Sequence, residues 1–248
     1  MKTSPIVEPD EFADTFKAPD LTVIIPTYNE EGSVVKAIES ATIQQPGLKV
    51  EVIVVDDSSL DETVSKVEEL QKIIENITIV KLKQNKGKAA ALNRVINKAT
   101  GDFVTFLDGD DYFEPDGLTK LIGRLKDFRY NVDTKMFAYG QTRYHGKSNN
   151  LHVPSVDVTL KHFARFNPVC SVIFVPREAL QKSGIRFDPD PRVWEDWLFM
   201  ARLVQNGFKP IPFADILVLH YNFDDTGRYA YGVSVGATQN TLRKINER

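Results

Sequence analysis

Residues 102–115, DFVTFLDGDDYFEP, pass directly from an apolar run into three aspartates. The run at 102–107 is typical of a buried strand, because strands covered on both faces are nearly continuous in apolar residues. Asp108, Asp110 and Asp111 then place three carboxylates within four positions. Like charges at this spacing repel unless a cation or several hydrogen-bond donors lie among them. Something in the fold must therefore neutralise this charge.

Two interpretations account for the aspartates. Aspartate and glycine favour turns, and Pro115 suits the first turn of a helix whose positive end Glu114 or Asp116 would approach. Such capping explains one carboxylate and leaves the others without a role. Alternatively, carboxylate oxygens are the ligands that hard ions such as Mg²⁺ and Mn²⁺ prefer. From this motif alone, a capped turn and a metal site both stay open.

Short apolar strands alternate with amphipathic helices over the first half of the chain. The expected strands are residues 21–25, 50–57, 77–82 and 102–107, and helices are expected around 34–41, 60–76 and 87–99. This alternation predicts an α/β fold with a parallel, doubly wound sheet. Ligands bind such a sheet beyond the carboxyl ends of its strands. The aspartates should therefore lie beside TYNEE (27–31) and DDSS (56–59).

The pattern changes after residue 128. We expect strands at 136–144, 168–175 and 216–221 and a helix at 195–207. No linker rich in glycine, serine or proline separates the two halves, so we expect a single domain. It would comprise an N-terminal arm (1–20), a first half (21–128) and a second half (129–248) that ends in a mobile segment.

The composition excludes several classes of protein. With 248 residues, 42% of them hydrophobic, the chain can bury a large core. Its net charge of −3 offers no general attraction to nucleic acid or to anionic lipid, which leaves only local basic patches as sites for such partners. A single cysteine, Cys170, excludes an intramolecular disulfide and a cysteine-based zinc site. No apolar run approaches the ~18 residues of a membrane helix, so we expect a soluble cytoplasmic protein, with peripheral membrane attachment left open.

The strand ends carry residues suited to a nucleotide. Neither G-x-G-x-x-G nor G-x-x-x-x-G-K-[ST] occurs, so both common phosphate cradles are missing. Instead Tyr28, Asp56, Asp57 and the basic loop NKGK (85–88) stand at strand ends. An aromatic ring can stack on a base, a carboxylate can accept from a base or ribose, and a metal with a lysine can neutralise a diphosphate. Together they predict a site for a nucleoside diphosphate.

Four motifs resemble those of family 2 glycosyltransferases with the GT-A fold. They are PTYNEEGSVVKAIES (26–40), VIVVDDSSLDET (52–63), NKGKAAALNRVINKATGDFVTFLDGDD (85–111) and WEDW (194–197), in the expected order. The resemblance covers roughly residues 21–220. It implies a Rossmann-like, mostly parallel sheet flanked by helices, with a smaller mixed acceptor-side subregion. It also implies an inverting, metal-dependent transfer from a nucleoside diphosphate sugar, with UDP preferred, to an acceptor hydroxyl in glycan or polysaccharide synthesis.

The resemblance also implies roles for individual residues. Asp110 would be the direct ligand of Mn²⁺ or Mg²⁺, with Asp108 nearer the ribose or a metal-bound water, and Asp196 would be the catalytic base. The nucleotide would contact a further group of residues, namely Pro26, Thr27, Tyr28, Asn29, Asp57 with Asp56, and Lys88. For Asp111 we expect a helix cap.

Several assignments keep alternatives. Asp56 and Asp57 could instead cap the following helix, as Glu195 and Asp196 could cap theirs. His220 is either a further metal ligand or diphosphate donor, or a structural histidine. Arg228 would lie in a mobile segment that closes over the diphosphate, as the family resemblance implies.

The acceptor would be a glycan, a lipid-linked sugar or a protein. Two alternative functions are a nucleotide-sugar-binding module without turnover and a polyprenyl-phosphate glycosyltransferase.

Overall fold

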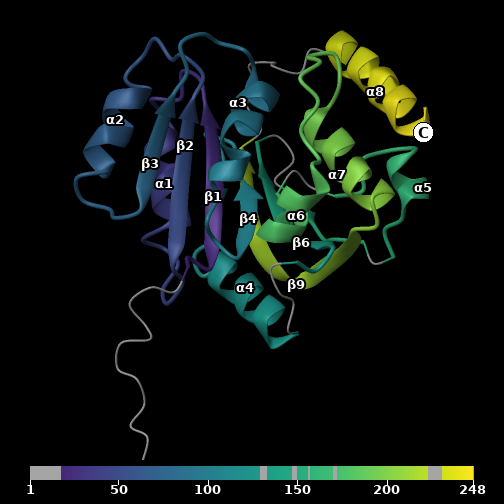
Figure 1. Cartoon of the computed structure of the whole chain (residues 1–248), viewed down its shortest axis with the longest axis horizontal. Coiled ribbons are helices and arrows are strands. Elements are labelled where there is room, and N and C mark those ends of the chain that lie inside the picture. Colours follow the sequence, from purple (N-terminus) through teal and green to yellow (C-terminus); the bar gives the residue numbers. More distant parts are fainter. Residues whose placement is uncertain are drawn as a thin grey trace, which may run out of the picture.

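The computed structural model describes residues 18–128, 133–146, 150–155, 157–169, 172–222 and 231–247 (Figure 1). Its strands are β1 (Leu21–Thr27), β2 (Val50–Asp56), β3 (Ile77–Lys81), β4 (Phe103–Phe106), β5 (Tyr112–Phe113), β6 (Met136–His145), β7 (Leu151–His152), β8 (Phe174–Pro176) and β9 (Lys209–Asn222). Its helices are α1 (Val34–Ala41), α2 (Thr63–Leu70), α3 (Lys88–Val95), the 3₁₀ turn η1 (Ile96–Lys98), α4 (Gly117–Asp127), α5 (Leu160–Phe163), α6 (Arg177–Ser183), α7 (Glu195–Gln205) and α8 (Tyr231–Asn246). The described strands form one mixed sheet in the order β3-β2-β1-β4-β8-β6-β9-β5, with β7 paired to β6.

Strands β3, β2, β1 and β4 form the parallel half of the sheet, as the alternation of strands and helices predicts. All residues of β1 are buried, because the strand is paired on both edges and covered on both faces. β1 continues to Thr27 rather than ending at Pro26. β1 pairs with β4 only as far as Ile24. The missing backbone N–H of Pro26 therefore interrupts no hydrogen bond between β1 and β4. The four predicted strands are confirmed to within two residues.

The second half of the sheet departs from the predicted strands. Of the described residues in the stretch 168–175, only Phe174 and Val175 lie in a strand, as the first two residues of the three-residue β8. The stretch 216–221 is part of the 14-residue β9. β9 runs parallel to β6, and their register shifts beside Gly140. A Cβ atom at Gly140 would lie 2.3 Å from Cγ2 of Val218, so glycine permits the close approach of the two strands. Because β9 is stabilised by this long-range pairing with β6, it is longer than the apolar stretch that predicts it.

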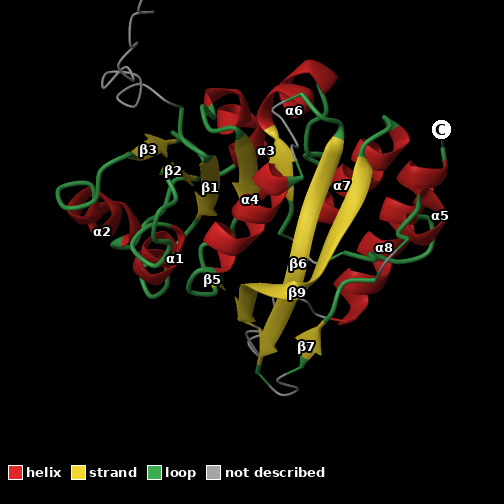
Figure 2. Cartoon of the chain, turned by 90° about the horizontal axis from the view of Figure 1, so that it is seen from below, coloured by secondary structure: helices red, strands yellow, loops and turns green. Residues whose placement is uncertain are grey.

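Helices cover both faces of the sheet (Figure 2). Helices α1, α2 and α4 pack against one face, where Val23 and Val54 point, and α3, α6 and α7 pack against the other, where Ile24 and Val55 point. Alternate residues of a strand thus enter separate cores. Helix α8, which the sequence pattern does not predict, packs on α7. None of the described helices has the length and apolar character needed to cross a membrane.

Candidate active site

Polar side chains from the carboxyl ends of β1, β2 and β4 meet in a cleft of about 500 Å³. The starts of α3 and α7 and the end of β9 complete its walls. The lining residues are Pro26, Thr27, Tyr28, Asn29, Glu30, Asp57, Lys88, Ala91, Asp108, Gly109, Asp110, Glu195, Tyr221 and Asn222. Asp56, Asp196 and His220 are outside this lining. Asp196 instead borders a narrow cleft that shares Lys88 and Asp108 with the larger one.

The loop after β1 forms one wall of the cleft. Tyr28 is 41% exposed, so its ring can stack on a planar ligand. Asn29 has φ of 56°, in the left-handed region that asparagine tolerates. Its backbone N–H donates to Oγ of Ser59 at 2.9 Å, and its side-chain oxygen accepts from the N–H of Leu60 at 2.8 Å. These bonds join the loops after β1 and β2 and hold Tyr28 at the rim.

The two aspartates at the end of β2 are buried and have different partners. The carboxylate of Asp57 accepts from the backbone N–H groups of Lys86 and Gly87 at 2.7 to 3.1 Å. Asp56 accepts from a backbone N–H within its own turn at 3.1 Å. Neither caps α2, which begins at Thr63 and has no side-chain cap from either residue. Asp57 thus positions the loop that leads into α3, and Asp57 also lines the cleft.

Lys88, the first residue of α3, brings a cation into the cleft. Its Nζ lies 2.7 and 2.8 Å from the two carboxylate oxygens of Asp108 and 3.1 Å from Oε1 of Glu195. Burial alone would lower the pKa of Lys88, but the carboxylates of Asp108, Glu195 and Asp196 raise this pKa well above its ordinary value. One permanent ammonium therefore faces three carboxylates, and the site can accept further positive charge.

Asp108, Asp110 and Asp111 form a compact group of oxygen ligands. One carboxylate oxygen from each lies within 4.8 Å of the others. Carboxylate oxygens at this spacing fit the ligand preference of Mg²⁺ or Mn²⁺. The structure therefore supports the metal-site interpretation of residues 108–111 better than the capped-turn interpretation.

Asp111 has a role that the sequence did not predict. The expectation that it caps the next helix is wrong, because α4 begins at Gly117, directly after Asp116. Asp111 instead accepts from the backbone N–H of Asn222 at 2.8 Å and ties the loop to β9. Burial and the carboxylate of Asp108 raise the pKa of Asp111 well above its ordinary value, against the lowering effect of the Asn222 N–H.

Asp196 lies in the first turn of α7, at the positive end of the helix. It borders the narrow cleft together with Lys88 and two stacked rings, Phe187 and Phe199, whose centroids are 4.0 Å apart. Burial and the neighbouring Glu195 raise the pKa of Asp196 to about 6, although Lys88 lowers it. A carboxylate with a pKa near neutrality is well suited to accept a proton.

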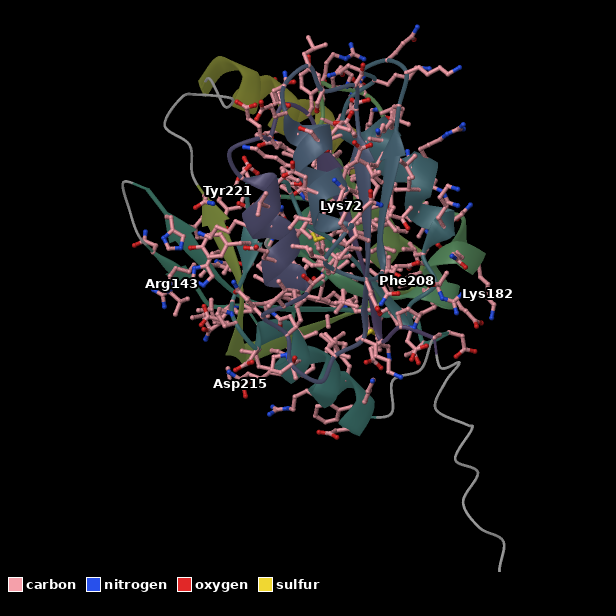
Figure 3. The ribbon with its side chains drawn as sticks, turned by 90° about the vertical axis from the view of Figure 1, so that its left-hand side faces the viewer. Lys72, Arg143, Lys182, Phe208, Asp215 and Tyr221 are labelled. Atoms are coloured by element: carbon pink, nitrogen blue, oxygen red, sulfur yellow. The ribbon has the colours of Figure 1, made fainter. Side chains whose placement is uncertain are left out.

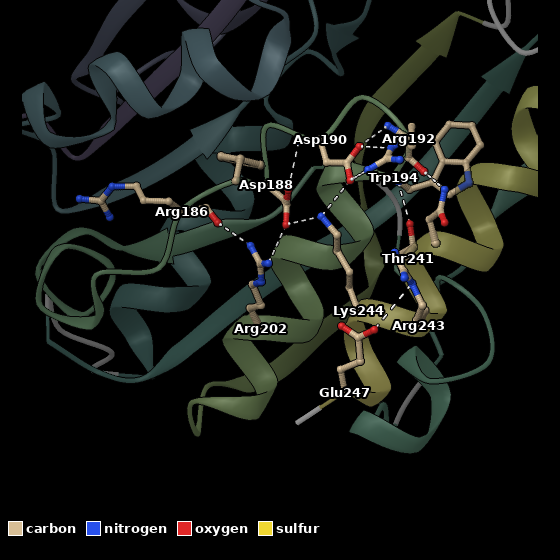
Figure 4. Close-up of polar contacts among 12 residues, drawn as sticks. Arg186, Asp188, Asp190, Arg192, Trp194, Arg202, Thr241, Arg243, Lys244 and Glu247 are labelled. Atoms are coloured by element: carbon tan, nitrogen blue, oxygen red, sulfur yellow. Dashed lines mark hydrogen bonds and ion pairs between the residues drawn. The ribbon is translucent and has the colours of Figure 1, made fainter.

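An ion-pair network holds the segment that enters α7 (Figure 4). Oδ2 of Asp188 lies 2.8 Å from Arg202 on α7 and 3.0 Å from Lys244 on α8. The backbone N–H of Trp194, directly before α7, donates to Oγ1 of Thr241 on α8 at 2.8 Å. Helix α8 thereby fixes the start of α7, and with it the position of the aspartate in its first turn.

His220 is not part of the group of three aspartates. Its Nε2 is hydrogen bonded to Glu114, and its Nδ1 is 2.8 Å from Nε2 of His145. Its ring also stacks on Tyr112, with centroids 4.6 Å apart. Both ring nitrogens are thus engaged by side chains of a separate polar cluster. Arg228 lies outside the described residues.

Comparison with known proteins identifies the family. A family model described as glycosyl transferase family 2 matches residues 22–181. The chain belongs to glycosyl transferase family 2. This family 2 chain is 30% identical over 205 residues to the succinoglycan biosynthesis protein ExoO of Rhizobium meliloti (strain 1021), covering 77% of this chain and 57% of ExoO. Over 112 residues it is 40% identical to the GalNAc(5)-diNAcBac-PP-undecaprenol beta-1,3-glucosyltransferase of Campylobacter jejuni, covering 44% of this chain and 35% of that one.

Solved structures show the same GT-A fold. TarS 1-349 of S. aureus in complex with UDP-GlcNAc matches with a TM-score of 0.71 at 22% identity, covering 86% of this chain and 64% of that one. The mannosyltransferase PcManGT of Pyrobaculum calidifontis, in complex with GDP-Man and Mn²⁺, matches with a TM-score of 0.66 at 23% identity, covering 92% and 65%. The present chain thus spans less than two thirds of the length of ExoO, of TarS 1-349 and of PcManGT.

Sequence reasoning misses several residues of the cleft, among them Glu195, Tyr221 and Asn222. Glu195 is visible in WEDW but suggests only a helix cap, and its contact with Lys88 depends on how α7 packs beside α3. Tyr221 and Asn222 carry no local signal, because they reach the cleft through the pairing of β9 with β5. Figure 3 shows Tyr221 on β9 and Arg143 on β6 at the same side of the molecule, where these two strands run side by side.

Proposed function

We propose that the protein is a metal-dependent, inverting glycosyltransferase that moves a sugar from a nucleoside diphosphate sugar, preferably a UDP-sugar, to an acceptor hydroxyl in glycan synthesis. The observation that carries this proposal is the position of Lys88. Its ammonium contacts Asp108 at the larger cleft and borders the same narrow cleft as Asp196. A cation suited to a diphosphate and a carboxylate suited to proton transfer therefore adjoin one reaction site.

The donor would bind in the half formed by residues 21–128. Tyr28 would stack on the base, within the wall formed by Pro26, Thr27 and Asn29. Asp57 would accept from an N–H of the base through Oδ1, since this oxygen accepts only the N–H of Lys86 from the loop and has a second lone pair. Uracil offers a suitable N–H, which supports a UDP-sugar.

The aspartate group would hold a divalent cation, Mn²⁺ or Mg²⁺. Asp110 and Asp108 supply oxygen ligands at a suitable spacing. When bound, such a cation supplies Lewis-acid stabilisation of the charge on a leaving diphosphate. Lys88 would turn from Asp108 towards the diphosphate and add a second positive charge.

Asp196 would act as the general base. It would take the proton of the acceptor hydroxyl as that oxygen bonds to the anomeric carbon. The bond from that carbon to the diphosphate oxygen breaks in the same displacement, its electron pair leaves with the diphosphate, and the anomeric centre is inverted. The half formed by residues 129–248 would position the acceptor, which is a glycan, a lipid-linked sugar or a protein.

Calorimetric titration of UDP, GDP, dTDP and CDP, with and without Mn²⁺, tests the donor site. We expect one nucleotide to bind in a metal-dependent manner and Asp110→Asn to abolish this dependence. Asp127→Asn, an exposed change at the end of α4, is the matched control and should bind like the unchanged protein. Failure of all four nucleotides to bind would reject the proposed donor site.

The transfer itself is tested by release of nucleoside diphosphate from the matching sugar donor, with water or added glycans as acceptor. The anomeric configuration of the product, measured by NMR, should be opposite to that of the donor. Retention of configuration would contradict the role given to Asp196.

A further inference from the structure

A third cavity, of about 590 Å³, lies between strand β3 and helix α3. It shares no lining residue with the donor cleft. Its walls are residues 80–84, at the end of β3, together with Lys86, Ala90 and Arg94. In Figure 1, β3 is the left-hand edge of the sheet and α3 lies nearer its middle. We call this cavity the basic groove.

The basic groove concentrates positive charge. Its lining contains no acidic residue and four basic ones, Lys81, Lys83, Lys86 and Arg94. Lys81 is paired with Glu68. The other three are exposed and form no ion pair with any carboxylate in the described part of the chain. Because the whole chain carries a net charge of −3, this local charge is opposite in sign to the average.

The floor of the basic groove is aliphatic. Val80 and Leu82 are half-buried there and pack against the core beneath α3. No aromatic ring lines the groove, so it offers no stacking platform for the bases of single-stranded nucleic acid or for the face of a sugar. Cations around an aliphatic floor instead match a lipid interface, where phosphate charge and hydrocarbon lie close together.

Protection of the sheet edge does not explain all of this charge. Lysines on an edge strand discourage pairing with another chain, and this accounts for Lys81 and Lys83. Lys86 and Arg94 belong to the following loop and to α3, yet they face the same groove. Their convergence points to an anionic partner.

We propose that the basic groove docks the protein on a bilayer that contains anionic phospholipid. Only Gly87 separates Lys86 in the groove from Lys88 in the donor cleft. Docking would therefore place the rim of the donor cleft close to the membrane surface. The inference concerns binding and stands independently of the catalytic proposal.

Vesicle co-sedimentation of the full chain tests the inference. The vesicles are phosphatidylcholine alone and phosphatidylcholine mixed with phosphatidylglycerol. Each Lys or Arg near an anionic surface strengthens partitioning about fivefold. Lys83→Gln with Arg94→Gln should therefore weaken partitioning onto the mixed vesicles about 25-fold. Lys120→Gln with Lys209→Gln, on α4 and β9, makes the same change in net charge away from the groove and should bind like the unchanged protein.

Three results would overturn the inference. They are equal binding to both kinds of vesicle, unchanged binding of the groove variant, and loss of binding in inorganic phosphate but not in chloride of the same ionic strength, which would indicate a site for free phosphate. A fourth such result is binding of soluble polyphosphate without binding of vesicles, which would reassign the groove to a polyanion. Thermal unfolding of each variant checks its fold. A second measurement needs no variant: binding of the unchanged protein to the mixed vesicles should weaken as the salt concentration rises.

Discussion

The ammonium group of Lys88 lies 2.7 Å from a carboxylate oxygen of Asp108. This contact joins the first residue of α3 to the aspartate that follows β4, so the start of a helix and the end of the next strand share one charge pair. Glu195 and Asp196 add two further carboxylates around the same cation. The arrangement is suited to a ligand that brings its own negative charge together with a divalent cation, and it makes the electrostatics of the cleft open to direct test.

Replacing the proposed base should separate turnover from binding. A general base contributes about 10²- to 10⁴-fold, so Asp196→Asn should lower the rate of nucleoside diphosphate release by about that factor. Donor affinity should stay nearly constant, because Asp196 is outside the lining of the donor cleft. Steady-state rates and calorimetric titration measure the two effects. A collapse of donor affinity would show that Asp196 belongs to the donor site.

The rate should depend on pH through the same carboxyl group. Burial and Glu195 raise the pKa of Asp196 to about 6, and only the ionised form can accept a proton. We therefore expect kcat/KM to rise with pH through about 6 and then to level off. A profile that is flat between pH 5 and 7, measured with a fixed metal concentration, would contradict this role.

The raised pKa also affects stability. Between the ordinary value of 3.8 and about 6, the folded protein holds a proton on Asp196 that the unfolded chain releases. The associated stability is present below the ordinary pKa and is lost as pH rises through the folded pKa. Asp196→Asn should therefore raise the melting temperature at pH 7 but not at pH 3.5. Scanning calorimetry at the two pH values distinguishes this from a general packing effect.

Removing the cation of the cleft should shift the pH profile. Lys88 lowers the pKa of Asp196, so Lys88→Gln should move the rise in kcat/KM to higher pH. The variant should also bind the nucleoside diphosphate more weakly, because the diphosphate loses a charged partner. Lys72→Gln, an exposed change after α2, serves as control and should alter neither property. An unshifted profile in the Lys88 variant would argue against electrostatic contact with Asp196.

The ion pairs around Asp188 should stabilise the fold in a pH-dependent manner. Burial raises the pKa of Asp188, but the N–H of Asp190 and the cations Lys244 and Arg202 lower it overall. Its contribution is therefore present above the ordinary pKa and lost as pH falls below it. Asp188→Asn should cost about 1 to 3 kcal/mol at pH 7, since Arg202 loses its carboxylate partner and Lys244 keeps only that of Asp190. This corresponds to roughly 2 to 4 °C of melting temperature per kcal/mol.

This variant should also lower turnover more than nucleotide affinity, because the network holds the start of α7 rather than the donor cleft. Equal losses in turnover and affinity would mean that the network supports the whole molecule. Asp215→Asn, whose partner Arg124 is on the exposed face of α4, gives a matched comparison and should cost little.

Two glycines should respond oppositely to the same substitution. A Cβ at Gly140 would lie 2.3 Å from Val218 Cγ2 and 2.6 Å from the carbonyl oxygen of Ile216. Gly140→Ala should therefore destabilise the protein by about 1 to 3 kcal/mol through overpacking. Gly123 lies in α4 with no atom near its would-be Cβ, so Gly123→Ala should stabilise by about 0.5 to 1 kcal/mol. Urea unfolding measures both, and a tolerated Gly140→Ala would contradict the close packing of β6 and β9.

The parallel half of the sheet was predictable because its signals are local. Runs such as 50–56 are apolar and β-branched, and the helices between them have one apolar face, so each element is specified by its own residues. The carboxyl ends of parallel strands meet at one edge, which already brings Tyr28, Asp57 and Asp108 to one cleft.

Tertiary structure alone decided the partners of the polar side chains in the second half of the sheet. Whether Asp111 caps a helix or binds β9 depends on β5–β9 pairing across more than a hundred residues. The partners of His220 likewise come from β6 and from the loop after β5. The sequence determined the parallel strands and the acids at their ends, because spacing along one element encodes burial and turns. Only packing decided which acids share a cation, because the attraction between two charges depends on their distance in space and not on their separation along the chain.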